Sequence, residues 1–206
     1  MIEVARDGGL WTLTLARPEK ANALTEPMLE ALVVAVAEAR AAGVQALVLT
    51  GQGTVFSAGA DLEAARAGLA TSPLWEVLSN ALASLPALTI AALNGTVAGG
   101  AMGMVLACDI RLAVPHARAF YPVMRLGFLP QPSDPARLAV LIGPARAALI
   151  LMAGARLTAE EALAFGLFDR IMPEAEVLSA AQALAADALA ASPAHLAAIK
   201  TMIPRA

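Results

Sequence analysis

Residues 88–108 read LTIAALNGTVAGGAMGMVLAC, and this stretch decides the fold. It opens with a short apolar run, Leu88 to Leu93, whose composition suits a buried β-strand. The run breaks at Asn94-Gly95, and Gly99-Gly100 leads into a second apolar segment that predicts a helix. A strand that passes through glycines into a helix leaves main-chain N–H groups unpaired at the helix start. Such a corner suits a bound anion or a developing oxyanion.

Three other interpretations of this stretch exist. Small residues at Gly95, Gly99 and Gly103 suit a membrane helix, but Asn94 and the absence of a basic flank argue against a span. A dinucleotide-binding fingerprint fails because Ala98 stands where its first glycine is required. A core strand and helix that bind no ligand remain the third alternative.

Composition narrows the class of protein. The 206 residues are enough for one domain, or for one domain with a small helical appendage. The net charge is −3 and the basic residues are scattered, so no nucleic-acid surface is expected. Cys108 is the only cysteine, which excludes an intramolecular disulfide and favours a reducing compartment. The first residues lack the features of a signal peptide, and we expect a cytoplasmic protein without a membrane span.

Strands alternate with helices along most of the chain, which predicts a mostly parallel α/β core. A hairpin is expected around Asp7-Gly8-Gly9, a proline-rich loop over residues 130–135, and a capped helix start at Thr158. The other expected strands lie at 46–50, 109–114 and 119–121, and the other expected helices at 25–42, 74–85, 136–142, 145–152, 175–191 and 194–202.

Blocks along nearly the whole chain resemble the enoyl-CoA hydratase/isomerase (crotonase) superfamily, in the order in which that family has them. They are RPEKANAL at 17–24, FSAGADL at 56–62, the glycines and Cys108-Asp109 of the central stretch, GFLP at 127–130, GARLTAEEA at 154–162, and Gly166-Leu167. The resemblance implies an α/β fold with a spiral ββα core over residues 1–152 and C-terminal helices over 153–206, shorter than in the family. It also implies acyl-CoA as ligand and assembly as homotrimers or dimers of trimers.

By motif match, the resemblance places an oxyanion hole at the main-chain N–H groups of Ala58 and Gly100. A coenzyme A thioester would be the ligand, with no permanently bound cofactor. The residues that the resemblance assigns to the coenzyme A site are Lys20, Ala21, Ala23, Ala58, Ala60, Asp61, Leu62 and Gly100. Asp61 suits equally well a cap on the following helix. No metal site is expected, since two histidines without HxxxH spacing and one cysteine do not suit zinc.

The sequence differs from the family at the positions where family members carry catalytic acids. Hydratases of the family use two glutamates to hold and deprotonate a water, and these positions are Gly103 and Val123 here. Several isomerases carry an acid where this chain has Gln131, and none of the three residues transfers protons at neutral pH. The acid nearest in sequence that could replace them is Asp134. The alternative interpretation of Asp134 is a solvated carboxylate in the loop, without a catalytic role. Tyr121 is expected as a pocket wall.

Three functions therefore stay open. Proton transfer contributes about 100- to 10,000-fold to catalysis, so an oxyanion hole alone predicts a poor hydratase. The first hypothesis is a protein that binds acyl-CoA without hydratase chemistry. The second is an active isomerase or thioester hydrolase that uses another acid such as Asp134, and the third is a non-catalytic subunit of a mixed oligomer.

Overall fold

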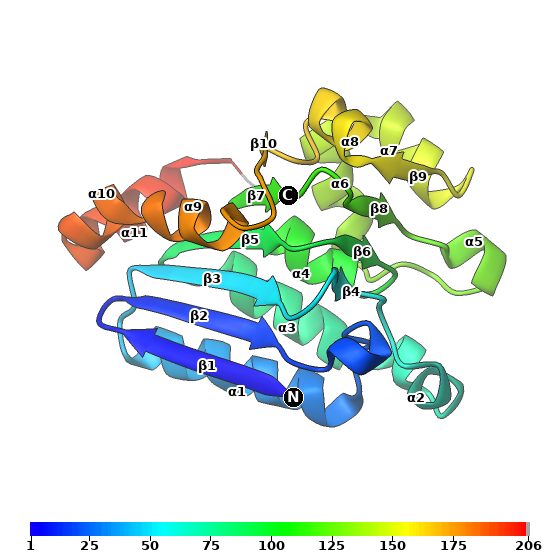
Figure 1. Cartoon of the computed structure of the whole chain (residues 1–206), viewed down its shortest axis with the longest axis horizontal. Helices are drawn as coiled ribbons and strands as arrows, with labels where there is room; N and C mark the ends of the chain where they lie inside the picture. The colour runs from blue at the N-terminus through cyan, green and yellow to red at the C-terminus, as the bar shows by residue number, and fades with distance from the viewer. Residues whose placement is uncertain (205–206) are drawn as a thin grey trace.

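The protein contains two β-sheets in the computed structural model, which describes residues 1–204 (Figure 1). The larger sheet has the order β1-β2-β3-β5-β7-β10, in which β1 is antiparallel to β2 and the other neighbours are parallel. The smaller sheet has the order β4-β6-β8-β9, in which β9 is antiparallel to β8. The strands are β1 (Ile2–Asp7), β2 (Leu10–Leu15), β3 (Ala46–Gly51), β4 (Val55–Ser57), β5 (Leu88–Leu93), β6 (Thr96–Ala98), β7 (Ile110–Ala113), β8 (Arg118–Phe120), β9 (Arg156–Thr158) and β10 (Arg170–Ile171).

A repeated ββα unit generates both sheets. Strand pairs β3–β4, β5–β6 and β7–β8 each send their first strand to the larger sheet and their second to the smaller one. Helices α1 (Glu26–Ala41) and α3 (Leu74–Ala83) lie on one face of the larger sheet, and α9 (Val177–Ala183) lies on the other (Figure 1). The expected α/β spiral is confirmed. The remaining helices are η1 (Pro18–Lys20), α2 (Leu62–Arg66), η2 (Leu69–Thr71), α4 (Ala101–Ala107), α5 (Val123–Leu126), α6 (Asp134–Ile142), α7 (Pro144–Leu151), α8 (Ala159–Phe165), α10 (Ala186–Ala190) and α11 (Pro193–Met202).

The central stretch forms the core of the molecule. Strand β5 lies between β3 and β7, and it is buried from Thr89 to Leu93, which explains its uninterrupted apolar run. The amide of Asn94 then bridges two loops, accepting from the Gly51 N–H at 3.1 Å and donating to the Gly53 carbonyl at 2.7 Å. All seven residues of α4 are buried. The strand and the helix were expected, whereas the short strand β6 between them was not.

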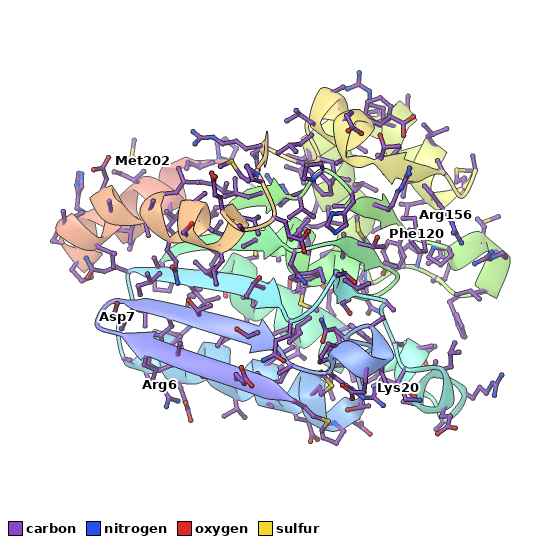
Figure 2. All side chains as sticks on the ribbon, viewed as in Figure 1. Arg6, Asp7, Lys20, Phe120, Arg156 and Met202 are labelled. Atoms are coloured by element: carbon purple, nitrogen blue, oxygen red, sulfur yellow. The ribbon has the colours of Figure 1, made fainter. Side chains whose placement is uncertain are left out.

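Residues after 152 add one strand to each sheet. Strand β9 pairs with β8, where the guanidinium of Arg156 lies 4.4 Å from the ring centre of Phe120 (Figure 2). Thr158 and Glu161 form a reciprocal capping box at the start of α8, as expected from the sequence. The single helix expected at 175–191 is instead divided into α9 and α10.

In residues 1–204, no one helix has the length and apolar character needed to cross a membrane, although the bent pair Val177–Ala190 and Pro193–Met202 meets both criteria jointly.

Candidate active site

A cavity of about 360 Å³ lies where the parallel strands β4, β6 and β8 end. Each strand is followed by a segment that forms part of the wall. The lining is mostly apolar and comprises Ala58, Ala60, Leu62, Ala65, Arg66, Ala70, Trp75, Gly99, Gly100, Tyr121, Pro122, Val123, Leu126, Phe128, Leu129 and Gln131. The three strand ends therefore form a pocket with few polar groups, which is typical of small-molecule sites.

Two glycine corners meet beside this cavity. Gly59 and Gly99 both have positive φ, +91° and +56°, a conformation that L side chains rarely adopt. A Cβ built on Gly59 would lie 2.8 Å from the Ala98 carbonyl oxygen and 3.4 Å from the Gly99 Cα. Glycine at 59 thus lets the segments after β4 and β6 touch, which brings their next residues, Ala60 and Gly100, to one cavity.

The main-chain hydrogen bonds of these corners correct the expected oxyanion hole. The N–H of Ala58 donates to the Ala21 carbonyl oxygen at 3.0 Å, so it is not free to bind a ligand, and its assignment was wrong. Within residues 1–204, the N–H groups of Ala60 and Gly100 donate no hydrogen bond. Ala60 sits in a parallel bridge with Leu24, whose own N–H and carbonyl bond Gly59 and Asp61. Ala60 and Gly100 therefore each place an unpaired main-chain donor on the lining of the cavity.

The residues assigned to the coenzyme A site fall into two groups. Four of them line the cavity: Ala58, Ala60, Leu62 and Gly100. The other four, which are Lys20, Ala21, Ala23 and Asp61, lie outside its lining. Lys20 is exposed on η1, where Figure 2 labels it.

Asp61 has a structural role that explains why it stays out of the cavity. Its side chain accepts from the N–H groups of Glu63 and Ala64 and so caps α2, which confirms the capping alternative. It also pairs with Arg17 at 2.8 Å. The Arg17 hydrogen bond and these N–H groups hold the pKa of Asp61 below its usual range.

The structure contradicts the alternative that Asp134 is a solvated loop carboxylate. It is the first residue of α6 and is fully buried, with a relative exposure of 0%. The Tyr121 hydroxyl lies 2.9 Å from Oδ2, whereas Oδ1 has no hydrogen-bond partner in the described residues. A Cβ built on Gly103 would lie only 3.0 and 3.1 Å from the two carboxyl oxygens. The carboxyl of Asp134 therefore occupies the space that a side chain at position 103 would enter.

Burial also changes the protonation of this pair. Loss of solvent raises the pKa of Asp134 to about 7, although the Tyr121 hydrogen bond and the Arg137 charge act in the opposite direction. Burial and the negative charge of Asp134 raise the pKa of Tyr121 well above its usual value. Both protonation states of Asp134 are thus populated near neutral pH, while Tyr121 remains a phenol. Sequence reasoning missed this because the partners come from α4 and from the segment after β8.

Asp134→Asn tests this pKa through protein stability. Between pH 3.8 and about 7 the folded protein holds a proton on Asp134 that the unfolded chain releases. The free energy of unfolding therefore falls as pH rises through this window, by at most about 4 kcal/mol for three pKa units. Urea unfolding at about pH 4 and about pH 8 measures this change. The free energy of unfolding of the variant, relative to that of the wild type, should be higher at about pH 8 than at about pH 4. A stability difference that does not change with pH would contradict the raised pKa.

Comparisons with known proteins add sequence and structural matches. A family model described as enoyl-CoA hydratase/isomerase matches residues 5–206. The probable enoyl-CoA hydratase echA6 of Mycobacterium tuberculosis is 34% identical over 187 residues, which is 91% of this chain and 75% of that protein. The 4-chlorobenzoyl coenzyme A dehalogenase-1 of an Arthrobacter species is 34% identical over 205 residues, 95% of this chain and 74% of that protein. A crystal structure of an enoyl-CoA hydratase from Bacillus anthracis matches with a TM-score of 0.90 at 29% identity, covering 97% of this chain and 81% of that one.

Proposed function

The chain belongs to the enoyl-CoA hydratase/isomerase family, and from this premise we propose that its cavity binds the thioester group of an acyl-CoA and stabilises the enolate derived from it. The observation that carries the proposal is the pair of unpaired N–H groups at Ala60 and Gly100 on one cavity. A carbonyl oxygen has two lone pairs and accepts two such hydrogen bonds. When negative charge develops on that oxygen, each donor contributes about 3 kcal/mol to the transition state.

The rest of the lining supports an acyl chain as the other half of the ligand. Trp75 and Val123 are buried in the wall, and Leu62 and Leu129 are strongly exposed at 76% and 87%. An apolar chain that covers these leucines would remove apolar surface from water, at about 25 cal/mol for each Å² buried. The donors thus suit the thioester carbonyl, and the walls suit the acyl tail.

Hydration of an enoyl-CoA through two carboxylates is not supported, because the two positions expected to carry them have no acid. Gly103 and Val123 carry no titratable group, and Gln131 is an amide. Among the described lining residues, the titratable side chains are Arg66 and Tyr121. The buried carboxyl behind Tyr121 nevertheless favours the second hypothesis, an active isomerase or thioester hydrolase that uses Asp134, over a protein that only binds the thioester.

Calorimetric titration tests the binding proposal directly. We expect octanoyl-CoA to bind, and a thioether analogue that lacks the carbonyl oxygen to bind roughly tenfold more weakly, because two hydrogen bonds are lost. The two ligands share the nucleotide and the chain, so the ratio isolates the carbonyl. Equal affinities would contradict the oxyanion hole. Flat titrations with thioesters of every chain length would overturn the proposal and leave the non-catalytic subunit.

A further inference from the structure

We infer that Asp134 and Tyr121 form a proton relay beside Gly103, with Tyr121 as the catalytic residue at the cavity and Asp134 as the group that positions and reloads its proton. The inference rests on the proposed function, because the relay needs an acyl thioester in the cavity. It goes further by assigning the proton transfer to two named side chains and by limiting the reaction class.

The first support is the shared space of two helices. Gly103 lies in α4 and Asp134 begins α6, and the carboxyl of Asp134 stands 3.0 to 3.4 Å from the Cβ position of residue 103. Contacts of 3.0 to 3.4 Å are tighter than nine in ten real Cβ contacts, so a Cβ at position 103 would require the carboxyl to shift by a few tenths of an ångström. The position of the Asp134 carboxyl therefore depends on the absence of a side chain at residue 103.

The second support is an unsatisfied oxygen. Oδ1 of Asp134 is fully buried without a hydrogen-bond partner within residues 1–204. Leaving such an atom unpaired costs about 1–3 kcal/mol, so buried polar atoms almost always find partners. The carboxyl therefore lowers the stability of the fold, and a buried group kept at such a cost is a candidate for a chemical role.

The third support is the connection to the cavity through Tyr121. Its hydroxyl contacts Asp134 Oδ2 at 2.9 Å and accepts from the Gln131 N–H at 3.4 Å. Tyr121 and Gln131 both line the cavity, whereas Asp134 does not. Tyr121 therefore joins the buried acid to the lining of the ligand space, which is the connection that a relay requires.

The charged groups near Asp134 form no ion pair with it in the described residues. On α6, Arg137 directs its guanidinium to Ser79 at 2.7 Å and to Asn80 at 2.6 Å. On α3, Glu76 accepts from Ser133 at 3.0 Å, and its charge raises the pKa of Asp134 further. Helix α4 presents no titratable group, since its residues are AMGMVLA. No ion pair of Asp134 exists among the described residues, and burial brings its pKa to about 7.

The relay accounts for every proton it moves. Ionised Asp134 takes the hydroxyl proton of Tyr121 while the phenol oxygen takes a proton from the α-carbon of the thioester. The C–H electron pair remains on the substrate as an enolate, whose oxygen accepts from Ala60 and Gly100. Tyr121 regains its proton in the same event, which agrees with the raised pKa that disfavours a phenolate. The reverse transfer returns the proton from Asp134 through Tyr121 to the α-carbon or, in a β,γ-unsaturated chain, to the γ-carbon.

This step consumes no water and no oxidant. Return of the proton to the γ-carbon moves the double bond into conjugation with the thioester, which is an isomerisation. Addition of water would need a second group to deprotonate that water, and the other titratable side chain in the described lining is Arg66, a permanent cation. We therefore assign the relay to double-bond isomerisation of β,γ-unsaturated acyl-CoA.

The test measures proton exchange separately from binding. Octanoyl-CoA is incubated in D₂O and α-deuterium is followed by mass spectrometry, while 3-octenoyl-CoA is followed by the absorbance of the conjugated product. We expect Asp134→Asn and Tyr121→Phe to lower both rates by about 100- to 10,000-fold, with octanoyl-CoA affinity unchanged within a few fold. Asp187→Asn, a carboxylate removed from the exposed side of α10, is the matched control and should keep the wild-type rates.

A pH profile separates a relay from a merely structural pair. The wild-type exchange rate should change with an apparent pKa near 7, and Glu76→Gln should move this value to lower pH because a repelling charge is removed. A purely structural Asp134 would show neither effect.

Two outcomes would overturn the relay and leave thioester binding intact: exchange within threefold of wild type in both variants, or octanoyl-CoA binding without any exchange. Absence of octanoyl-CoA binding would overturn the relay together with the proposed function.

Discussion

Replacing Gly100 by proline should slow enolate formation on a bound thioester by roughly 100- to 1,000-fold, because the variant removes one of the two oxyanion donors. The main-chain φ of Gly100 is −58°, which matches the fixed φ of proline, and α4 begins at the next residue. The substitution is therefore directed at the N–H group rather than at the course of the chain. Deuterium exchange at the α-carbon of octanoyl-CoA is the measurement.

Gly100→Ala is the matched control for this prediction. Both variants place a Cβ about 3.1 Å from the ring of Trp75, a contact that requires the ring to move slightly. Only the proline lacks the donor. The ratio of the two exchange rates therefore removes the effect of Cβ crowding against Trp75 and leaves the lost N–H group together with the added ring atoms of proline. Equal losses in both variants would show that the donor at position 100 contributes nothing.

The thioether analogue gives a second check on the same variants. Because it has no carbonyl oxygen, its affinity should be the same for Gly100→Pro and Gly100→Ala. The affinity for octanoyl-CoA should instead differ between them. If proline weakened both ligands equally, the effect would come from a changed pocket shape.

Gly95→Ala should lower the free energy of unfolding by more than about 4 kcal/mol, an effect that few single substitutions reach. A Cβ at this position would lie 2.0 Å from the Thr54 carbonyl oxygen and 2.9 Å from the Val55 Cα. Both obstacles are main-chain atoms, so no side-chain rotation relieves the overlap. Since domains are stable by only about 5–15 kcal/mol, much of the variant should be unfolded. Urea unfolding followed by circular dichroism measures the loss.

Gly8→Ala is the control for this second prediction. Gly8 has a positive φ of +53°, but no atom lies within 4 Å of its Cβ position. Its substitution should cost only the strain of the left-handed conformation, about 1–2 kcal/mol. A similar cost for both variants would contradict the interpretation that steric overlap, and not glycine flexibility, determines residue 95.

The comparison of Ala58 with Ala60 shows where sequence reasoning reached its limit. Both are alanines in one short motif, and nothing in their composition distinguishes them. The difference is the Ala21 carbonyl, which takes the Ala58 N–H from a turn 37 positions earlier in the chain. Whether an N–H group is free to bind a ligand depends on such distant partners. The motif therefore located the segment after β4 but not the residue in it whose N–H is unpaired.

Asp134 shows the same limit for a side chain. Flanking prolines at 132 and 135 suggested a solvated loop, yet α6 begins at Asp134 itself. Its burial results from packing against Gly103 in α4 and Tyr121 after β8. The absence of a side chain at 103 was visible from the sequence, but what fills that space was not.

The sequence by itself determined the buried strand β5, the helix α4, the capping box at Thr158 and the family, because each depends on neighbouring residues or on motifs in a fixed order. Only the tertiary structure decided which N–H groups stay unpaired at the cavity and where a carboxyl lies behind it. Hydrogen-bond pairing and desolvation are set by groups that meet through folding, often far apart along the chain, and those two quantities control the chemistry proposed for this site.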